Sequence, residues 1–325
     1  MRAVALAALL VLLTLTPTHA GSGCYVVVTF SNLVYDVEPL LCEGDVVEYL
    51  APPGVDPHNY QLSPSDVEKL RRADLVVSTA HAPFEVVVKD LIRRGELRAL
   101  LVEIPEIPGV KILSNPVLGT PNYHMPIYDP VNYVEFITYL ANTLSTLRPE
   151  CSKHYRDAAA RVASEVRELV DRAPKLSVVA AADTPLAQYA VTWLGVDVKY
   201  LVIREHGAPA SPSDVSRIRE AVRSGKVRLA VVAKPPRSKA SEMLKGIAGE
   251  AGIPVIYVPQ PFQEGSIIDK LRDVLTQALS IAGELEEPTS KAPTASAWPL
   301  WGAGAAVTAV VAVVVALAWL RRRSR

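Results

Sequence analysis

Apolar and polar residues are grouped in blocks along this chain, and the blocks switch between two periods. Short, continuous runs rich in Val, Ile, Leu and Ala predict strands, at residues 24–30, 45–50, 74–80, 110–113, 176–182, 196–203, 227–233 and 254–259. Between these runs, apolar residues recur at helical spacing, for example at residues 31–41, 64–72, 84–94, 131–147 and 265–281. Buried strands of parallel sheets are continuously apolar, because helices cover both of their faces. The pattern therefore predicts an α/β fold with mainly parallel sheets.

One segment interrupts the alternation and is long enough to join two lobes. In residues 150–172, apolar side chains recur every three or four positions, at Tyr155, Ala159, Val162, Val166 and Leu169. Pro149 and Pro174 flank this segment, as prolines do at helix ends. We therefore expect an N-terminal α/β lobe at residues 21–147, one long rigid helix at 148–174 and a C-terminal α/β lobe at 175–285. Ligands of such sheets bind outside the carboxyl ends of the strands.

The N-terminus has the features of an export signal. Arg2 is followed by an apolar run at residues 3–15 and by small residues near position 20. This arrangement is typical of a secretory signal peptide and is too short for a membrane-spanning helix. We expect residues 1–20 to be removed and the body of the protein to lie outside the cytoplasm.

The C-terminus predicts a membrane anchor. Residues 298–320 form a stretch of 23 residues without a charge, flanked by tryptophans and followed by the arginine-rich tail 321–325. About 20 apolar residues span a bilayer as a helix, and basic residues remain on the cytoplasmic side. Residues 286–297 are rich in Pro, Thr, Ser and Ala and predict a flexible linker. A single-pass protein with its body outside the cytoplasm is expected.

The charge balance changes once these ends are set aside. The whole chain has 34 basic and 34 acidic residues, and removing Arg2 and the four arginines after residue 320 leaves 29 basic residues against 34. A net charge of −5 argues against nucleic acid as a partner and mildly favours cations. Three cysteines are too few for a disulfide framework or a four-thiolate metal site. Cys24 opens the first predicted strand and Cys42 follows the next helix, so the sequence predicts either a Cys24–Cys42 disulfide, which would leave Cys151 unpaired, or free thiols.

The stretch "APPGVDPHNYQLSPSD", residues 51–66, is the most informative part of the sequence. It leaves a predicted strand at its carboxyl end, and its prolines and one glycine restrict and bend the backbone around His58. Ser63 and Pro64 then start a helix. A rigid loop that presents one imidazole suits a metal ligand, although a single loop histidine is more often structural.

Together with the following "VEKLRRADLVV", this stretch resembles the signature of the metal-binding receptors of zinc/manganese ABC importers. The resemblance extends over the exported part of the chain. It implies two α/β lobes bridged by one rigid helix, with four side chains from both lobes around the ion. It also implies that His58 is the first ligand. His124 in "NYHMPIYDPVNY" corresponds to the second, although its spacing to the Asp-Pro pair is one residue longer than in the family.

The third position departs from the family's pattern. The family usually has His or Glu after the first strand of the second lobe, whereas this chain has Ala182 followed by Asp183. Asp183 is either a ligand or the N-cap of the next helix. The fourth family ligand is an acidic residue after the last strand, where Glu264 stands, and helix capping is its alternative role. His81, after the third strand, is a further candidate for the missing ligand, and the alternative is a role in lining the cleft.

Other candidates are weaker. Glu85 starts a helix four residues after His81 and is expected to be solvated, and His206 lies in a turn. The chain has no nucleophile elbow, phosphate loop or HExxH motif, which argues moderately against an enzyme. Imidazoles with one or two carboxylates suit Zn²⁺, Mn²⁺ or Fe²⁺. The sequence therefore predicts an extracytoplasmic receptor that delivers a divalent transition metal to an ABC permease and its ATPase. The alternatives are a receptor for a metal chelate of the siderophore or cobalamin type, or a degenerate surface adhesin.

Overall fold

The structure is a computed structural model that describes residues 23–55, 58–205, 208–236 and 238–286. The predicted signal peptide, transmembrane helix and basic tail, most of the predicted linker, and His206 lie outside these residues. Among the described helices, none has the length and apolar composition to cross a bilayer.

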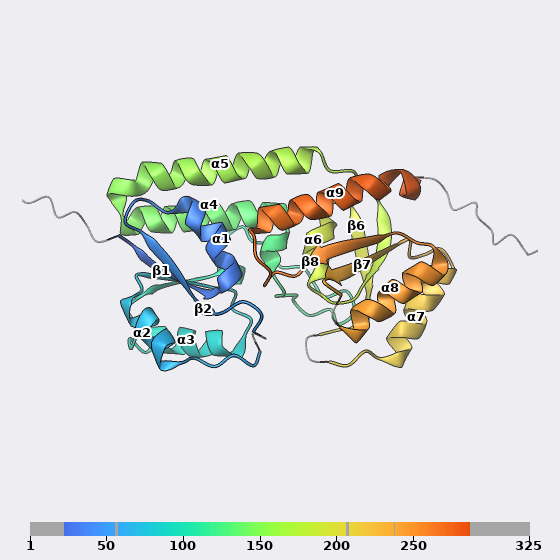
Figure 1. The fold of residues 1–325 in the computed structure, drawn as a ribbon, viewed down its shortest axis with the longest axis horizontal. Coiled ribbons are helices and arrows are strands. Elements are labelled where there is room, and N and C mark those ends of the chain that lie inside the picture. Colours follow the sequence, from blue (N-terminus) through green and yellow to red (C-terminus); the bar gives the residue numbers. More distant parts are fainter. Residues whose placement is uncertain (1–22, 56–57, 206–207, 237, 287–325) are drawn as a thin grey trace, which may run out of the picture. The chain divides into compact units, whose positions relative to one another are not determined.

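Two four-stranded parallel sheets confirm the predicted α/β class (Figure 1). The first has the order β2-β1-β3-β4, with strands β1 Tyr25–Phe30, β2 Val46–Ala51, β3 Leu75–Ser78 and β4 Leu100–Glu103. The second has the order β6-β5-β7-β8, with strands β5 Val178–Ala182, β6 Val196–Leu201, β7 Leu229–Lys234 and β8 Val255–Pro259. The same order in both sheets means that each lobe repeats one βα arrangement.

The fourth strand of the first sheet differs from the prediction. Residues 110–113 do not form a strand, because their backbone groups bond to side chains: Lys111 exchanges hydrogen bonds with Asn132, and the Leu113 amide donates to Tyr189 Oη at 2.9 Å. The edge position is instead taken by β4. This strand is short, and its Leu100 is 48% exposed, which explains why the apolar pattern did not reveal it.

Nine helices connect and cover the sheets in the described part of the chain: α1 Val34–Val37, α2 Pro64–Arg72, α3 Pro83–Arg93, α4 Pro130–Leu147, α5 Ser152–Asp171, α6 Ala187–Thr192, α7 Pro212–Arg223, α8 Lys239–Ala251 and α9 Ile267–Glu286. The predicted helix at 31–41 is broken into α1 and two 3-10 turns. The predicted connecting helix is α5, which packs along α4 (Figure 1). Helix α2 starts with a capping box in which Ser63 and Asp66 bond each other's backbone amides.

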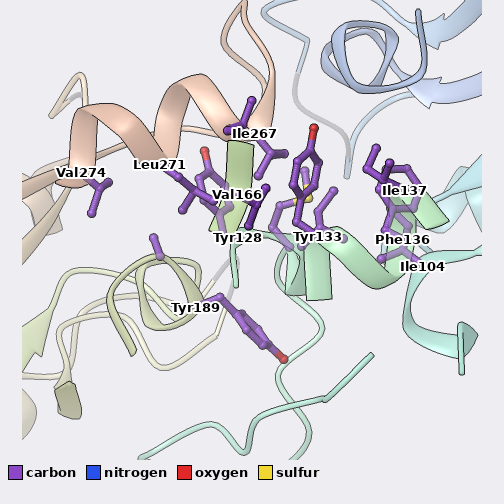
Figure 2. Close-up of a cluster of buried hydrophobic side chains, with 14 of the residues drawn as sticks. Ile104, Tyr128, Tyr133, Phe136, Ile137, Val166, Tyr189, Ile267, Leu271 and Val274 are labelled. Atoms are coloured by element: carbon purple, nitrogen blue, oxygen red, sulfur yellow. The ribbon is translucent and has the colours of Figure 1, made fainter. Parts of the chain in front are cut away.

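The two lobes share one hydrophobic core on the side of α4, α5 and α9. Successive residues of β1 alternate between two cores: Val26 and Val28 belong to the shared core, and Val27 belongs to a smaller one on the opposite face of the sheet. The shared core includes side chains from both sheets, and Figure 2 shows Tyr133, Val166 and Leu271 within it. Shifting one lobe against the other would disturb this packing.

A buried polar contact joins the lobes beside this core. Asp36 of α1 accepts hydrogen bonds through Oδ1 from Tyr133 Oη and from the Ile267 amide at the start of α9, both at 2.8 Å. Burial raises the pKa of Asp36 to about 7. Lys270 is also buried and donates to the carbonyl of Pro261 at 2.8 Å. The start of α9 is therefore attached to the N-terminal lobe.

The cysteines do not pair as predicted. The disulfide joins Cys42 to Cys151, and Cys24 is a buried free thiol. The prediction failed because it paired cysteines that lie close in the sequence, whereas the start of the α5 region folds back next to Cys42. Burial raises the pKa of Cys24 to about 12, so this thiol is unreactive at neutral pH.

Candidate metal centre

A cleft of about 1100 Å³ is lined by residues of both lobes. Its N-terminal wall includes His58 after β2, His81 after β3 and His124 before α4. The loops that leave the strands of the second sheet supply the opposite wall, with Thr184, Ile203, Pro235 and Phe262 among the lining residues. The cleft therefore lies at the carboxyl ends of the strands, where the fold class predicts a ligand site.

Three of the five predicted ligands lie next to one another in this cleft. The ring centroids of His58 and His81 are 5.2 Å apart at an interplanar angle of 88°, and those of His81 and His124 are 4.4 Å apart at 62°. The rings meet edge to face, and in the described part of the chain no group of three or more His, Cys, Asp and Glu side chains is arranged to hold a metal ion as it stands. The imidazoles are adjacent, but their nitrogens do not converge on one point.

Asn122 fixes the orientation of His124. The amide nitrogen of Asn122 donates to the carbonyl of Pro185 and to Gln188 Oε1, both at 2.9 Å. Its Oδ1 is therefore turned toward His124 and lies 2.8 Å from Nδ1 and 3.1 Å from the backbone amide of that histidine. Because an amide oxygen only accepts, Nδ1 carries the hydrogen, and Nε2 carries the lone pair that a metal requires.

Glu205 contacts His124 from the C-terminal lobe. Its Oε1 lies 2.9 Å from His124 Nε2. Glu205 follows β6, and its neighbour Arg204 is held by a hydrogen bond from Asn115 Nδ2 to the Arg204 carbonyl at 2.7 Å. The sequence analysis missed Glu205, although its place after a strand could have indicated it.

The loop that carries His81 is organised by Glu85, which is buried rather than solvated as predicted. Its carboxylate accepts five hydrogen bonds, from Ser78 Oγ, Thr79 N, Thr79 Oγ1, His81 N and Ala82 N. Ala80 adopts a left-handed conformation with φ of 55° within this loop. The prediction was wrong because the carboxylate binds the loop before its helix and does not face solvent.

His58 lies between a glycine turn after β2 and the start of α2. Gly54, with φ of 80°, makes the turn after β2, and the capping box of α2 begins at Ser63. Tyr60 Oη lies 2.9 Å from the carbonyl of Leu50 and 2.7 Å from Asp66 Oδ2. The chain that follows His58 is therefore held by Tyr60 and by the start of α2.

The structure does not bring Asp183 to the histidines. Asp183 is fully buried, and its Oδ2 accepts hydrogen bonds from the Ala233 amide at 2.9 Å and from Ser241 Oγ at 2.6 Å. Burial raises the pKa of this carboxyl group. Asp183 thus links β5 to β7 and α8 and is not among the residues that line the cleft.

Glu264 lies in the wall of the cleft, in the loop between β8 and α9, and is exposed. The amides at the start of α9 bond to other side chains: Ser266 and Asp269 bond each other, and Asp36 accepts from Ile267. The described lining contains neither Lys nor Arg. The described lining therefore combines imidazoles, the Glu264 carboxylate, uncharged hydroxyl and amide groups and apolar surface, which suits a cation better than an anion.

Comparison with known proteins gives a family match over most of the chain. The model of the ZnuA family, described as the periplasmic component A of the zinc-uptake complex, matches residues 26–275. A Thermotoga maritima protein with a provisional metal-binding description is 37% identical over 70 residues. Those residues are 22% of this chain and 26% of that relative's length.

Solved structures share the fold at low sequence identity. The Mn²⁺ complex of the solute-binding protein FpvC from Pseudomonas aeruginosa is 19% identical, with a TM-score of 0.65, over 79% of this chain and 99% of that one. A Cd-bound periplasmic metal-binding protein from Candidatus Liberibacter asiaticus is 18% identical, with a TM-score of 0.64, over 81% and 99%. A crystal structure of ZnuA is 17% identical, with a TM-score of 0.63, over 80% and 98%.

Proposed function

The chain belongs to the ZnuA family, the periplasmic component A of zinc-uptake complexes, and we propose that it captures a divalent transition-metal ion between its lobes and delivers it to an ABC permease. The observation that carries this proposal is the row of three imidazoles at the cleft, where His58, His81 and His124 adjoin. The three rings come from different loops, in which Glu85 binds the backbone amide of His81 and Asn122 binds the ring of His124. A purely structural role would not require three such loops to meet.

The proposed ligands are His58, His81 and His124, with Glu264 as a carboxylate of the opposite wall. His81 takes the place of the family's third ligand, since Ala182 has no ligand atom and Asp183 is bonded inside its lobe. The rings meet edge to face, so a shared ion would require side-chain rotation of at least one imidazole. Imidazole suits Zn²⁺ and Fe²⁺, and carboxylates add affinity for Mn²⁺.

The proposal is tested by calorimetric titration of the full-length protein with Zn²⁺ and with Mn²⁺. The double variant His58→Ala/His124→Ala should lose measurable binding, because two of the neutral nitrogen donors are removed. His154→Gln is the matched control, since His154 lies on α5 and bonds the carbonyl of Leu41. Binding by the double variant with wild-type affinity would refute the proposal.

A metal chelate is the second candidate cargo, and the size of the cleft favours it. A volume of about 1100 Å³ is at the upper end of small-molecule sites and far exceeds that of one ion with its waters. Phe30, Tyr123 and Phe262 supply apolar lining. The lack of Lys and Arg in the described lining disfavours anionic chelates. Titration with cobalamin and with a ferric siderophore, compared with the bare ions, distinguishes the two cargoes.

We also propose that the receptor works outside the cytoplasm, tethered by residues 298–320. The support is the sequence: an N-terminal export signal, 23 uncharged residues near the C-terminus and an arginine-rich tail. The proposal assigns no catalytic step to the chain. Fractionation of cells that express the full-length chain and a variant truncated after residue 290 tests the tether, since only the full-length chain should remain with the membrane.

A further inference from the structure

We infer that Glu205 is a metal ligand: it comes from the C-terminal lobe and would bind the ion next to His124. This inference rests on the proposed function and deepens it by naming a ligand after β6. The observation that carries it is the 2.9 Å contact between Glu205 Oε1 and His124 Nε2. The sequence did not point to this residue.

The contact between His124 Nε2 and Glu205 Oε1 needs a positive charge between the two atoms. Asn122 Oδ1 accepts from Nδ1 of His124, so in the neutral ring Nε2 presents a lone pair toward Glu205. A lone pair and a carboxylate oxygen repel each other at this distance unless a proton or a metal ion lies between them. The pair is therefore arranged for a positive charge that both atoms share.

The separation also fits coordination of one ion. Two ligand atoms, each about 2.1 Å from a metal, are roughly 3.0 Å apart at a right angle and roughly 3.4 Å apart at a tetrahedral angle. The observed 2.9 Å is close to the right-angled arrangement. The two atoms could bind one ion with little movement, whereas the edge-to-face imidazoles need to rotate.

Three contacts hold the backbone that leads up to Glu205. Asn115 donates to the Arg204 carbonyl, and the Arg204 side chain pairs with the buried carboxylate of Asp214 at the start of α7. Upstream, the Val202 amide donates to the carbonyl of Ala182 at 3.0 Å. Glu205 thus comes three residues after a partner of Ala182. The loop after the neighbouring strand β6 can therefore supply a carboxylate from the C-terminal lobe, in addition to the three imidazoles.

The test compares Glu205→Gln with Glu220→Gln in the full-length protein, by calorimetry with ZnCl₂ and MnCl₂. Glu220 is an exposed carboxylate on α7 that pairs with Arg223, so it controls for the loss of one negative charge. The amide introduced by Glu205→Gln would remove the charge and could cover His124 Nε2 with a donated hydrogen. We expect Glu205→Gln to lower affinity roughly tenfold for Zn²⁺ and more for Mn²⁺, which prefers carboxylates, and Glu220→Gln to bind like wild type.

A second measurement separates a ligand from a distant charge. The visible absorption of the Co²⁺-loaded protein reports the atoms bound to the ion, so its bands should shift in Glu205→Gln and stay unchanged in Glu220→Gln. If wild type binds and Glu205→Gln has unchanged affinity and bands, the inference on Glu205 is overturned and the proposed function stands. If wild type binds neither ion, both are overturned.

Discussion

The tautomer that His124 needs as a proposed metal ligand depends on one amide side chain. Asn122 is 1% exposed, and its side-chain nitrogen donates hydrogen bonds to Pro185 and Gln188. Its side-chain oxygen therefore faces the imidazole. This hydrogen bond places the proton on Nδ1 and leaves Nε2 for the ion. A hydrogen-bond acceptor on the nitrogen that does not bind the metal raises the basicity of the imidazole and fixes the orientation of its ring.

Replacing Asn122 should therefore weaken binding without touching a ligand. We expect Asn122→Ala to lower Zn²⁺ affinity by about 10- to 100-fold, measured by calorimetry. Asn122→Asp keeps an acceptor for Nδ1 but loses both hydrogen bonds that the amide nitrogen donates, so its affinity should fall between that of wild type and that of Asn122→Ala. If Asn122→Ala binds Zn²⁺ with wild-type affinity, Asn122 does not control the tautomer of His124.

At this scale the sequence pointed to three histidines that adjoin at the cleft, but not to the residues that contact them. His58 and His124 stand in stretches that resemble a known signature, and His81 follows a strand, so each could be proposed from position alone. Asn122, Glu85 and Glu205 act through contacts with segments far away in the chain or with a local turn that has no sequence pattern. Their roles follow only once the loops are seen together.

Among the elements, the strands and helices of regular period were predicted correctly, and the irregular ones were not. The boundaries of α2 matched because its capping box is local in sequence. Residues 110–113 were misjudged because side chains of α4 and α6 take their backbone hydrogen bonds. The Cys42–Cys151 pair spans 109 residues, and no local pattern indicates such a contact.

Helix α9 meets the N-terminal lobe through Asp36, and this contact should make stability depend on pH. The folded pKa of about 7 lies above the ordinary value of 3.8, so the folded protein takes up this proton first as the pH falls. The contribution of Asp36 to the free energy of unfolding therefore increases from pH 7 down to pH 4, by at most about 4 kcal/mol. Lys270 and Asp269 are the charged groups that act on it.

Asp36→Asn tests this contribution, because the amide resembles the protonated carboxyl group and keeps an acceptor for Tyr133 and Ile267. In urea denaturation, wild type should lose stability relative to Asp36→Asn as the pH rises from 4 to 7.5. Parallel pH profiles for the two proteins would show that Asp36 does not titrate in this range.

At the scale of the whole molecule, the cleft lies between lobes that share a core. The shared packing along α4, α5 and α9, together with the contacts of Asp36, resists a wide hinge motion. Capture of an ion is then mostly a matter of side-chain rotation and of small shifts in the loops. The two-lobe plan was predictable from the alternating pattern and the long helix at residues 152–171, whereas the shared core was not.

The most direct measurement is the position of a bound ion in crystals of the protein grown with Zn²⁺ or Mn²⁺, located by anomalous scattering. The account predicts one strong peak in the cleft, within about 2.0–2.3 Å of His124 Nε2 and bonded to at least one of His58 and His81. A peak elsewhere on the molecule, with the three imidazoles left in contact and without metal, would contradict it.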